Sequence, residues 1–524
     1  MIIRLLSRCH KGTLVRAGVR LAVVAVAMVL GVAGCTSGGG GAKSEGKPVL
    51  RLGLGTHGKS LNPAEDPTAT PSDVMRSLTN ESIIHMNPDG SLGPGLATSW
   101  RYVGSDNTDF EFTLRDDARF SDGTSVNADA VKRWLEYFPS AHGPAASYMA
   151  LKSIKTVGEW TVQLDLSSPN PDVPVLLSEA FHWGAVSSPK AVADPSVLGT
   201  RTFGGGQYTV DPAASVTGSK YTLVPNKFYY DPSRIRFSKV VVEVIENPSS
   251  RLAAIGSGQL DVAFGDQATA AQAKTAAMNV LTVPYGTGGL VITDRVGKLA
   301  KPLGDVRVRQ ALNYALDRDA ITTGLFGEAA TPTSVYLTIN GFDPSDRNHY
   351  PYDPEMAKSL LAAAGYPSGF TVKVLVAGVA GQYGLALAQA IGKYLAAVGV
   401  KLDIKTAATG GEFQQMLPTF PVLAGGGPAN PMTQIYAAFF SQGGPGNPFN
   451  FNSSALDTLY QQAITAPADK TSQYWRQMSQ EIARQAYFVP VVEQEMFWYS
   501  SKNVHGVAAN MRSLYPFATE WSLG

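Results

Sequence analysis

Two hydrophobic periodicities alternate along the chain. Apolar and polar residues that alternate singly predict half-buried strands, and apolar residues at intervals of three and four predict helices with one buried face. The predicted strands lie at 49–54, 110–115, 159–166, 370–376, 400–404 and 488–492. The predicted helices lie at 128–138, 249–255, 306–316, 354–364, 383–398, 455–465 and 470–487. Because the two kinds of element alternate, we expect an α/β fold.

Capping residues indicate where several of these helices begin and end. Asn127, Asp305 and Asp353 stand directly before predicted helices. A side-chain oxygen at that position accepts a hydrogen bond from a backbone N–H of the first turn. Gly365 and Gly399 directly follow predicted helices, where glycine is favoured because it adopts positive φ without strain.

The first 34 residues contain five basic residues, no acidic residue and a terminal apolar run at 21–34. That run is shorter than the about 18 residues that a membrane-spanning helix needs and is typical of a signal peptide. It ends in Val32-Ala33-Gly34-Cys35, which resembles the lipobox of bacterial lipoproteins. The resemblance implies cleavage before Cys35, a lipid anchor on its sulfur and a flexible glycine-rich tether at 35–47. An ordinary anchor helix that happens to end near a cysteine is the alternative.

Length and composition exclude several classes of protein. About 490 residues follow the predicted signal, which is too many for one hydrophobic core. The chain has 43 basic and 42 acidic residues and no long run of either, so we expect no nucleic-acid partner. Cys9 would leave with the signal and Cys35 would carry the lipid, so we expect no disulfide and no cysteine-based metal site. The histidines show no H-x-x-x-H spacing, which argues against a zinc centre.

A nucleotide site is also rejected, although residues 53–60, GLGTHGKS, match the phosphate-loop pattern G-x-x-x-x-G-K-[ST] at every fixed position. Such a loop must lead from a buried strand straight into a helix whose first N–H groups hold the phosphates. Here Pro63, Pro67 and Pro71 lack backbone donors and block a regular helix. Residues 240–243, VVVE, resemble the Walker B motif, the apolar run ending in an acidic residue that accompanies a phosphate loop. Such runs are common in buried strands.

Four longer motifs, in this order, resemble the family 5 solute-binding proteins of ABC importers, the group that includes oligopeptide, dipeptide and nickel receptors. The motifs are 110–115 with 120–123 and 128–131, then 251–262, 305–318 and 352–366. Most of their residues are helix caps, turn glycines and arginines such as Arg307 and Arg309, for which we expect structural roles. The motifs therefore indicate a fold without indicating a ligand.

The resemblance implies a two-lobed α/β fold, the large, cluster C-like form of the type II periplasmic binding proteins. Lobe 1 is expected at 48–81, 181–284 and 489–524, and lobe 2 at 285–488. An extra domain inserted in lobe 1 is expected at 82–180. Two strands, near 285–293 and 488–500, would cross between the lobes and act as the hinge.

The resemblance also implies a ligand in the cleft between the lobes. The residues that it places there are His57, Lys59, Phe203, Gln207, Tyr285, Gly427, Asn430, Tyr436 and Trp498. Peptide-binding members often carry an aspartate near 423–431 that meets the peptide ammonium, whereas no acidic residue lies between Glu412 and Asp457 here. A buried cation without a counter-charge is costly, so peptides with a free α-amine are expected to bind poorly. A modified peptide or a neutral solute remains open, and aromatic residues such as Tyr436 and Trp498 suit a core equally well.

The function implied is that of a receptor and not of an enzyme. We expect a monomer without catalytic residues, cofactor or bound metal, anchored at the outer face of the cytoplasmic membrane. It would close on a peptide-like small solute and deliver it to the permease subunits of an ABC importer. A nickel or metal-chelate receptor on the same fold is the first alternative, with His57 and His182 as its candidate residues. A secreted hydrolase is the second, but neither G-x-S-x-G nor H-E-x-x-H occurs.

Overall fold

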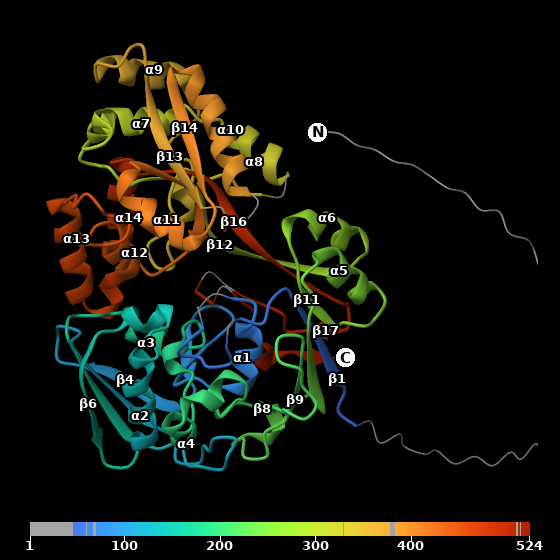
Figure 1. Cartoon of the computed structure of the whole chain (residues 1–524). Coiled ribbons are helices and arrows are strands. Elements are labelled where there is room, and N and C mark those ends of the chain that lie inside the picture. The colour runs from blue at the N-terminus through green and yellow to red at the C-terminus, as the bar shows by residue number, and fades with distance from the viewer. Residues whose placement is uncertain are drawn as a thin grey trace, which may run out of the picture. The chain divides into compact units, whose positions relative to one another are not determined.

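A ten-stranded mixed sheet dominates the part of the chain that the computed structural model describes, residues 46–58, 60–66, 70–327, 330–377, 383–509, 512–513 and 515–524 (Figure 1). From edge to edge, its strands are β14 (Val400–Ala407), β13 (Phe370–Ala377), β15 (Val422–Pro428), β12 (Asn279–Ile292), β16 (Phe488–Ser500), β11 (Val262–Phe264), β1 (Val49–Leu54), β10 (Lys239–Val244), β9 (Lys220–Pro225) and β8 (Tyr208–Val210). The predicted signal peptide, Cys35 and Lys59 lie outside the described residues. None of the described helices is long and apolar enough to cross a bilayer.

The long strands β12 and β16 join the two halves of this sheet. They pair antiparallel from Asn279↔Ser500 to Val291↔Phe488, with irregularities at Pro284/Gly286 and Gly288/Gly289 (Figure 1). On one side β12 also pairs with β15, and on the other β16 pairs with β11. Each half has its own hydrophobic core, with Leu52 and Val240 in one and Val374 and Ile391 in the other.

A separate four-stranded antiparallel sheet lies within residues 97–166. Its strands, in order, are β4 (Ala97–Val103), β5 (Asp109–Leu114), β7 (Thr161–Leu166) and β6 (Leu151–Val157). Trp134 of α2 (Ala128–Ser140) and Phe110 belong to the core against it. The turn between β4 and β5 contacts the C-terminal part of the chain, because Asn107 Nδ2 donates to the carbonyl oxygens of Ile464 and Ala466, both at 2.9 Å.

Fourteen α-helices are described in these residues, and the predicted α/β class is confirmed. Besides α2, they are α1 (Asp73–Thr79), α3 (Val173–Leu176), α4 (Pro189–Ala193), α5 (Pro248–Gly256), α6 (Gln267–Thr275), α7 (Val306–Tyr314), α8 (Arg318–Phe326), α9 (Pro354–Ala363), α10 (Tyr383–Ala397), α11 (Gly410–Met416), α12 (Met432–Phe439), α13 (Ser454–Thr465) and α14 (Ala468–Arg484). The short strands β2 (Ile84–Met86) with β3 (Leu92–Pro94), and β17 (Val504–His505) with β18 (Ser522–Leu523), form two further pairs.

The predicted caps are confirmed. Asn127, Asp305 and Asp353 each accept a hydrogen bond from a backbone N–H of the following helix. The helix expected at 306–316 ends two residues earlier, because Asp317 caps the next helix, α8. Arg309 has the structural role expected of it, since its Nε donates to the carbonyl oxygen of Gln485 at 3.0 Å.

Candidate functional site

The loop after the first strand does not have the geometry of a phosphate loop. β1 ends at Leu54, and the next helix, α1, begins only at Asp73. Gly58 has φ +81°, and a Cβ at this position would lie 2.4 Å from an oxygen of the buried Asp66. Glycine is therefore required at position 58 by a close internal contact, and the loop after β1 does not lead straight into a helix, as a phosphate loop would.

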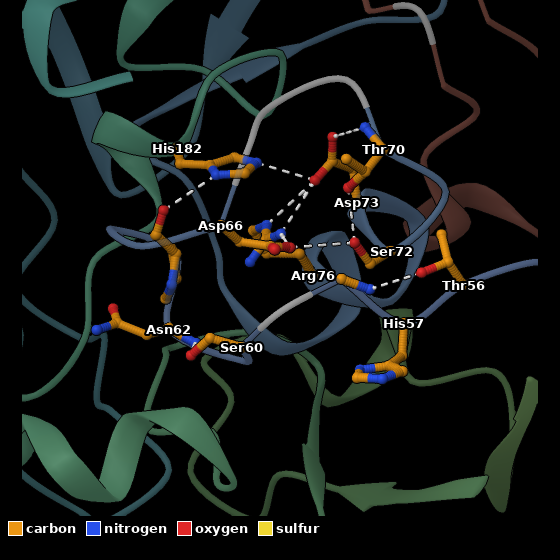
Figure 2. A network of polar contacts seen from close by, with 12 residues as sticks. Thr56, His57, Ser60, Asn62, Asp66, Thr70, Ser72, Asp73, Arg76 and His182 are labelled. Carbon is orange, nitrogen blue, oxygen red and sulfur yellow. Dashed lines mark hydrogen bonds and ion pairs between the residues drawn. The ribbon is translucent and has the colours of Figure 1, made fainter. Parts of the chain in front are cut away.

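Asp66 belongs to a buried ionic network beneath this loop (Figure 2). The Nη2 of Arg76 lies 2.9 Å from Asp66 and 3.2 Å from Asp73. Ring nitrogens of His182 lie 2.9 Å from Asp73 Oδ1 and 3.0 Å from the carbonyl oxygen of Pro63. Both ring nitrogens of His182 are therefore engaged by oxygen atoms within the protein. Two carboxylates, an arginine and a histidine thus contact one another, and both ring nitrogens of His182 are directed at these internal partners.

The electrostatics of Asp73 follow from this pairing. Burial by itself would raise the pKa of its carboxyl, but the charges of His182 and Arg76 and the hydrogen bond from His182 outweigh burial and hold the pKa below the ordinary value of 3.8. No cluster of three or more histidine, cysteine, aspartate or glutamate side chains suited to a metal occurs in the part of the chain that the structure describes.

A cavity of about 230 Å³ lies on one face of the sheet, over β12, β15 and the start of β16. Gly289, Gly425, Gly426 and Gly427 form part of its lining, and Gly289 is paired with Gly425 across the two strands. Because glycine has no side chain, these positions leave room above the backbone of the sheet. The other residues that line the cavity are Thr287, Leu290, Val291, Tyr336, Phe413, Leu423, Ala424, Phe439, Phe488 and Pro490, none of which carries a charge.

Aromatic rings form much of the cavity wall. The rings of Tyr336 and Phe488 are stacked with centroids 4.5 Å apart, and Phe439 packs edge-on against Phe488 at 5.3 Å. Burial, with a smaller contribution from Tyr285, raises the pKa of Tyr336 to about 12, so its hydroxyl stays neutral at physiological pH. The cavity therefore suits an apolar or aromatic group and offers no counter-charge to a cation.

Three of the residues predicted for the ligand lie at or beside this cavity. Gly427 lines it, opposite Thr287. Tyr285 lies in β12, two residues before Thr287, where its carbonyl oxygen accepts a hydrogen bond from the backbone N–H of Ala429 at 2.6 Å. Asn430 lies next to Ala429 and donates from Nδ2 to the carbonyl oxygen of Pro428 at 3.2 Å.

The other described candidates lie elsewhere and make contacts within the protein. The hydroxyl of Tyr436 donates to Asp457 at 2.6 Å, and its ring stacks on another tyrosine. Gln207 is buried and donates to the carbonyl oxygen of Thr519 at 3.3 Å. The ring of Phe203 lies 5.2 Å from the guanidinium carbon of Arg201.

Trp498 and His57 are also away from the cavity. Trp498 is fully buried in the core around β1, so in this conformation its indole has no surface to offer a ligand. A tryptophan in a hydrophobic strand is compatible with a place in the core and with a place in the cleft, so the sequence could not distinguish between these two positions. His57 is half-buried, with Nδ1 3.4 Å from the hydroxyl of Tyr221.

The sequence interpretation missed Tyr336 and Phe488 as lining residues, whereas Thr287 falls in the stretch 285–289 that it considered for the ligand. The available signal was glycine: the runs around 286–289 and 425–427 both fall in strands and remove side chains from the sheet. The two glycine runs predict a cavity only when β12 and β15 are known to be neighbouring strands.

A second cavity, of about 190 Å³, contains an acidic side chain, Asp172. This carboxylate is buried and accepts hydrogen bonds from Asn340 Nδ2 at 3.1 Å and from Thr433 Oγ1 at 2.7 Å. Burial outweighs these bonds and raises the pKa of Asp172. Each of its two oxygens therefore accepts one hydrogen bond from a residue far along the chain.

Comparison with known proteins gives one consistent result. Residues 91–446 match the family described as bacterial extracellular solute-binding proteins, family 5 Middle. The chain is 26% identical to heme-binding protein A of Haemophilus influenzae over 455 residues, 79% of this chain and 81% of that protein. It is 24% identical to glutathione-binding protein GsiB of Escherichia coli over 485 residues, 87% of this chain and 91% of that protein. The solved structure of HbpA2 from Haemophilus parasuis aligns with a TM-score of 0.77 at 21% identity, covering 91% of this chain and all of that one.

Replacement of Asp73 by asparagine is expected to destabilise the protein by about 3–5 kcal/mol at pH 7, because it removes the buried carboxylate that contacts both Arg76 and His182. Since the pKa of Asp73 is lowered in the folded state, its contribution is present above the unfolded value and is lost as the pH falls through the folded one. The difference between wild type and variant in chemical denaturation should therefore be constant from pH 7 to pH 5 and shrink below about pH 4. The exposed Asp403→Asn serves as control, and an equal effect of both substitutions would contradict the network.

Replacement of Gly427 by leucine is expected to fill the cavity. A Cβ at this position would meet no atom within 4 Å, so the substitution should leave the melting temperature almost unchanged. Fluorobenzene, followed by fluorine NMR, should bind the wild type and lose at least tenfold in affinity for the variant. Gly324→Leu, in α8 and equally free of neighbours, should bind as the wild type does. Undiminished binding to the Gly427 variant would show that the aromatic probe occupies another place.

Proposed function

The chain belongs to family 5 of the bacterial extracellular solute-binding proteins, and from that premise we propose that it is the lipid-anchored receptor of an ABC importer for a peptide-like solute. The observation that carries the proposal is the uncharged, glycine-floored and aromatic-walled cavity beside the strands that join the two halves of the sheet. The receptor binds without making or breaking a bond and delivers its solute to permease subunits.

The division into lobes is part of this proposal. Lobe 1 comprises 48–81, 181–284 and 489–524, lobe 2 comprises 285–488, and the extra domain is 82–180. The four-stranded sheet within 97–166 supports the last of these, and the irregular pairing at Pro284/Gly286 supports a hinge in β12 and β16. Closure of the lobes around the solute, as a monomer, would be the signal that the permease recognises.

The proposed contacts are centred on the cavity. Gly427, Tyr285 and Asn430 are retained from the sequence prediction, and Thr287 and Tyr336 are added from the lining. Backbone groups of the glycines would bond the amides of a peptide-like solute, while the aromatic wall would take an apolar side chain. The remaining sequence candidates stay predictions, as ligand contacts in a form in which the two lobes are closed differently. They are His57, Lys59, Phe203, Gln207, Tyr436 and Trp498.

The class of solute follows from the absence of charge. No acidic side chain lines the cavity, so the ammonium of an unmodified peptide would be buried without a partner. We therefore favour an N-modified peptide or another amide-containing solute. The metal-chelate alternative is weakened because His182 is committed on both ring nitrogens.

A thermal-shift comparison of matched peptides tests this function. Di- to pentapeptides with an acetylated N-terminus should raise the melting temperature by several degrees at millimolar concentration, since ligand that binds the native state stabilises it by mass action. The same peptides with a free α-amine should raise it by less than one degree. Chelated nickel is included as the rival solute. A large shift with free-amine peptides, or with the chelate alone, would contradict the proposal.

The lipid anchor is tested separately with Cys35→Ala. Expressed in a bacterium that processes lipoproteins, the wild type should sediment with membranes and the variant should appear in the soluble extracytoplasmic fraction, because the lipid chain supplies the membrane affinity. Ser37→Ala, two residues away, is the control and should remain with the membranes. If the cysteine variant also sediments with membranes in the absence of detergent, the chain is held there by another means.

A further inference from the structure

Arg295, three residues after the end of β12, is a buried cation with an unused hydrogen-bonding edge. Its exposed fraction is 2%. Its Nη1 donates to the carbonyl oxygen of Phe439 at 2.7 Å. Its Nε and Nη2 are buried and have no hydrogen-bond partner among the described residues.

Aromatic rings surround this guanidinium, and no carboxylate of the described residues is paired with it. The guanidinium carbon lies 4.9 Å from the ring of Phe440, 5.6 Å from Tyr487 and 5.8 Å from both Phe451 and Phe488. Ring faces attract a cation, but they do not satisfy N–H donors directed elsewhere. Burial, together with the neighbouring charge of Arg309, lowers the pKa of Arg295 to about 9, so the group remains charged at neutral pH.

The unused edge is the one that this chain employs elsewhere to hold carboxylates. Arg115 donates from Nε and Nη2 to the two oxygens of Asp117, at 2.5 and 3.0 Å. Arg484 does the same with Glu481, at 2.8 and 2.7 Å, and Arg347 pairs with Glu493 through the same two nitrogens. The Nε and Nη2 protons form a planar fork that matches the two oxygens of a carboxylate.

The position of Arg295 relates this fork to the uncharged cavity. Phe439, whose carbonyl accepts from Nη1, and Phe488, whose ring faces the guanidinium, both line that cavity. The cation therefore lies next to two residues of the aromatic wall. Both are side chains with few rotamers, and movement of either one would connect the cavity to the fork.

We propose that the Nε and Nη2 edge of Arg295 is an oxyanion-binding site, which receives a carboxylate of the solute when Phe439 or Phe488 moves aside. The assignment of the oxyanion to the solute rests on the proposed function. The site itself does not, because an inorganic oxyanion such as sulfate has the same acceptor chemistry. A solute of this receptor would then combine an apolar body with a negative end and carry no free ammonium group.

Calorimetric titration of the full-length chain with phenylacetate and with its neutral analogue phenylacetamide tests the proposal. The wild type should bind the acid at least tenfold more tightly than the amide. Arg295→Met, which keeps the length of the side chain and removes its charge, should bind both equally, and Arg295→Lys should retain the charge but lose most of the preference. Arg101→Met, at an exposed ion pair with Glu111, is the matched control and should behave as the wild type does.

A purely structural Arg295 gives the opposite results. In that case the wild type binds acid and amide equally, or the preference for the acid persists in Arg295→Met, and either outcome overturns the proposal. The methionine variant is expected to fold, since replacement of an unpaired buried charge by an apolar group is often neutral or stabilising.

A titration with sulfate, without organic solute, distinguishes a carboxylate of the solute from an inorganic anion as the natural occupant of the site. Sulfate that stabilises the wild type but not Arg295→Met supports the site. If acid and amide nevertheless bind the wild type equally, the assignment to the solute is overturned and the site belongs to an inorganic anion. If no peptide-like solute of any kind binds, the receptor function fails, while the sulfate response still reports on Arg295 alone.

Discussion

The antiparallel pairing of β12 with β16 is the constraint on which the rest of the structure depends. These two strands are shared by both halves of the ten-stranded sheet, since β12 continues to β15 and β16 continues to β11. The cavity floor, the wall residue Phe488 and the buried Arg295 all lie on or directly beside them. Any bending of these strands would therefore change the relative position of the halves and the shape of the cavity at the same time.

Buried charges are handled in two different ways in this molecule. Beneath the first-strand loop, Asp66 and Asp73 contact Arg76 and His182, so the buried carboxylates have internal partners. Behind the cavity, Arg295 faces aromatic rings and one carbonyl oxygen. A low-dielectric interior strengthens the attraction between paired charges and raises the cost of an unpaired one. The paired network around Asp73 therefore suits a structural role, and the unpaired Arg295 suits the binding of an anion.

Local features could be predicted from the sequence because they depend on near neighbours. The caps at Asn127, Asp305 and Asp353 need only a side-chain oxygen and the following turn. The rejection of the phosphate loop needed only the prolines that follow it. Ligand contacts were harder, because Trp498 and Gln207 have residue types that suit a cleft and a core equally well, and their burial results from packing against distant segments.

The sequence by itself determined the α/β class, the positions of most helices and strands, the family resemblance and the lack of an acidic residue between Glu412 and Asp457. Only the tertiary structure decided where the cavity lies and what surrounds Arg295. Gly289 and Gly425 share a sheet face because strand register pairs them, and the rings of Phe440 and Phe488 meet the guanidinium because separate elements pack there. Register and packing depend on contacts between residues far apart in the chain, and no local pattern contains them.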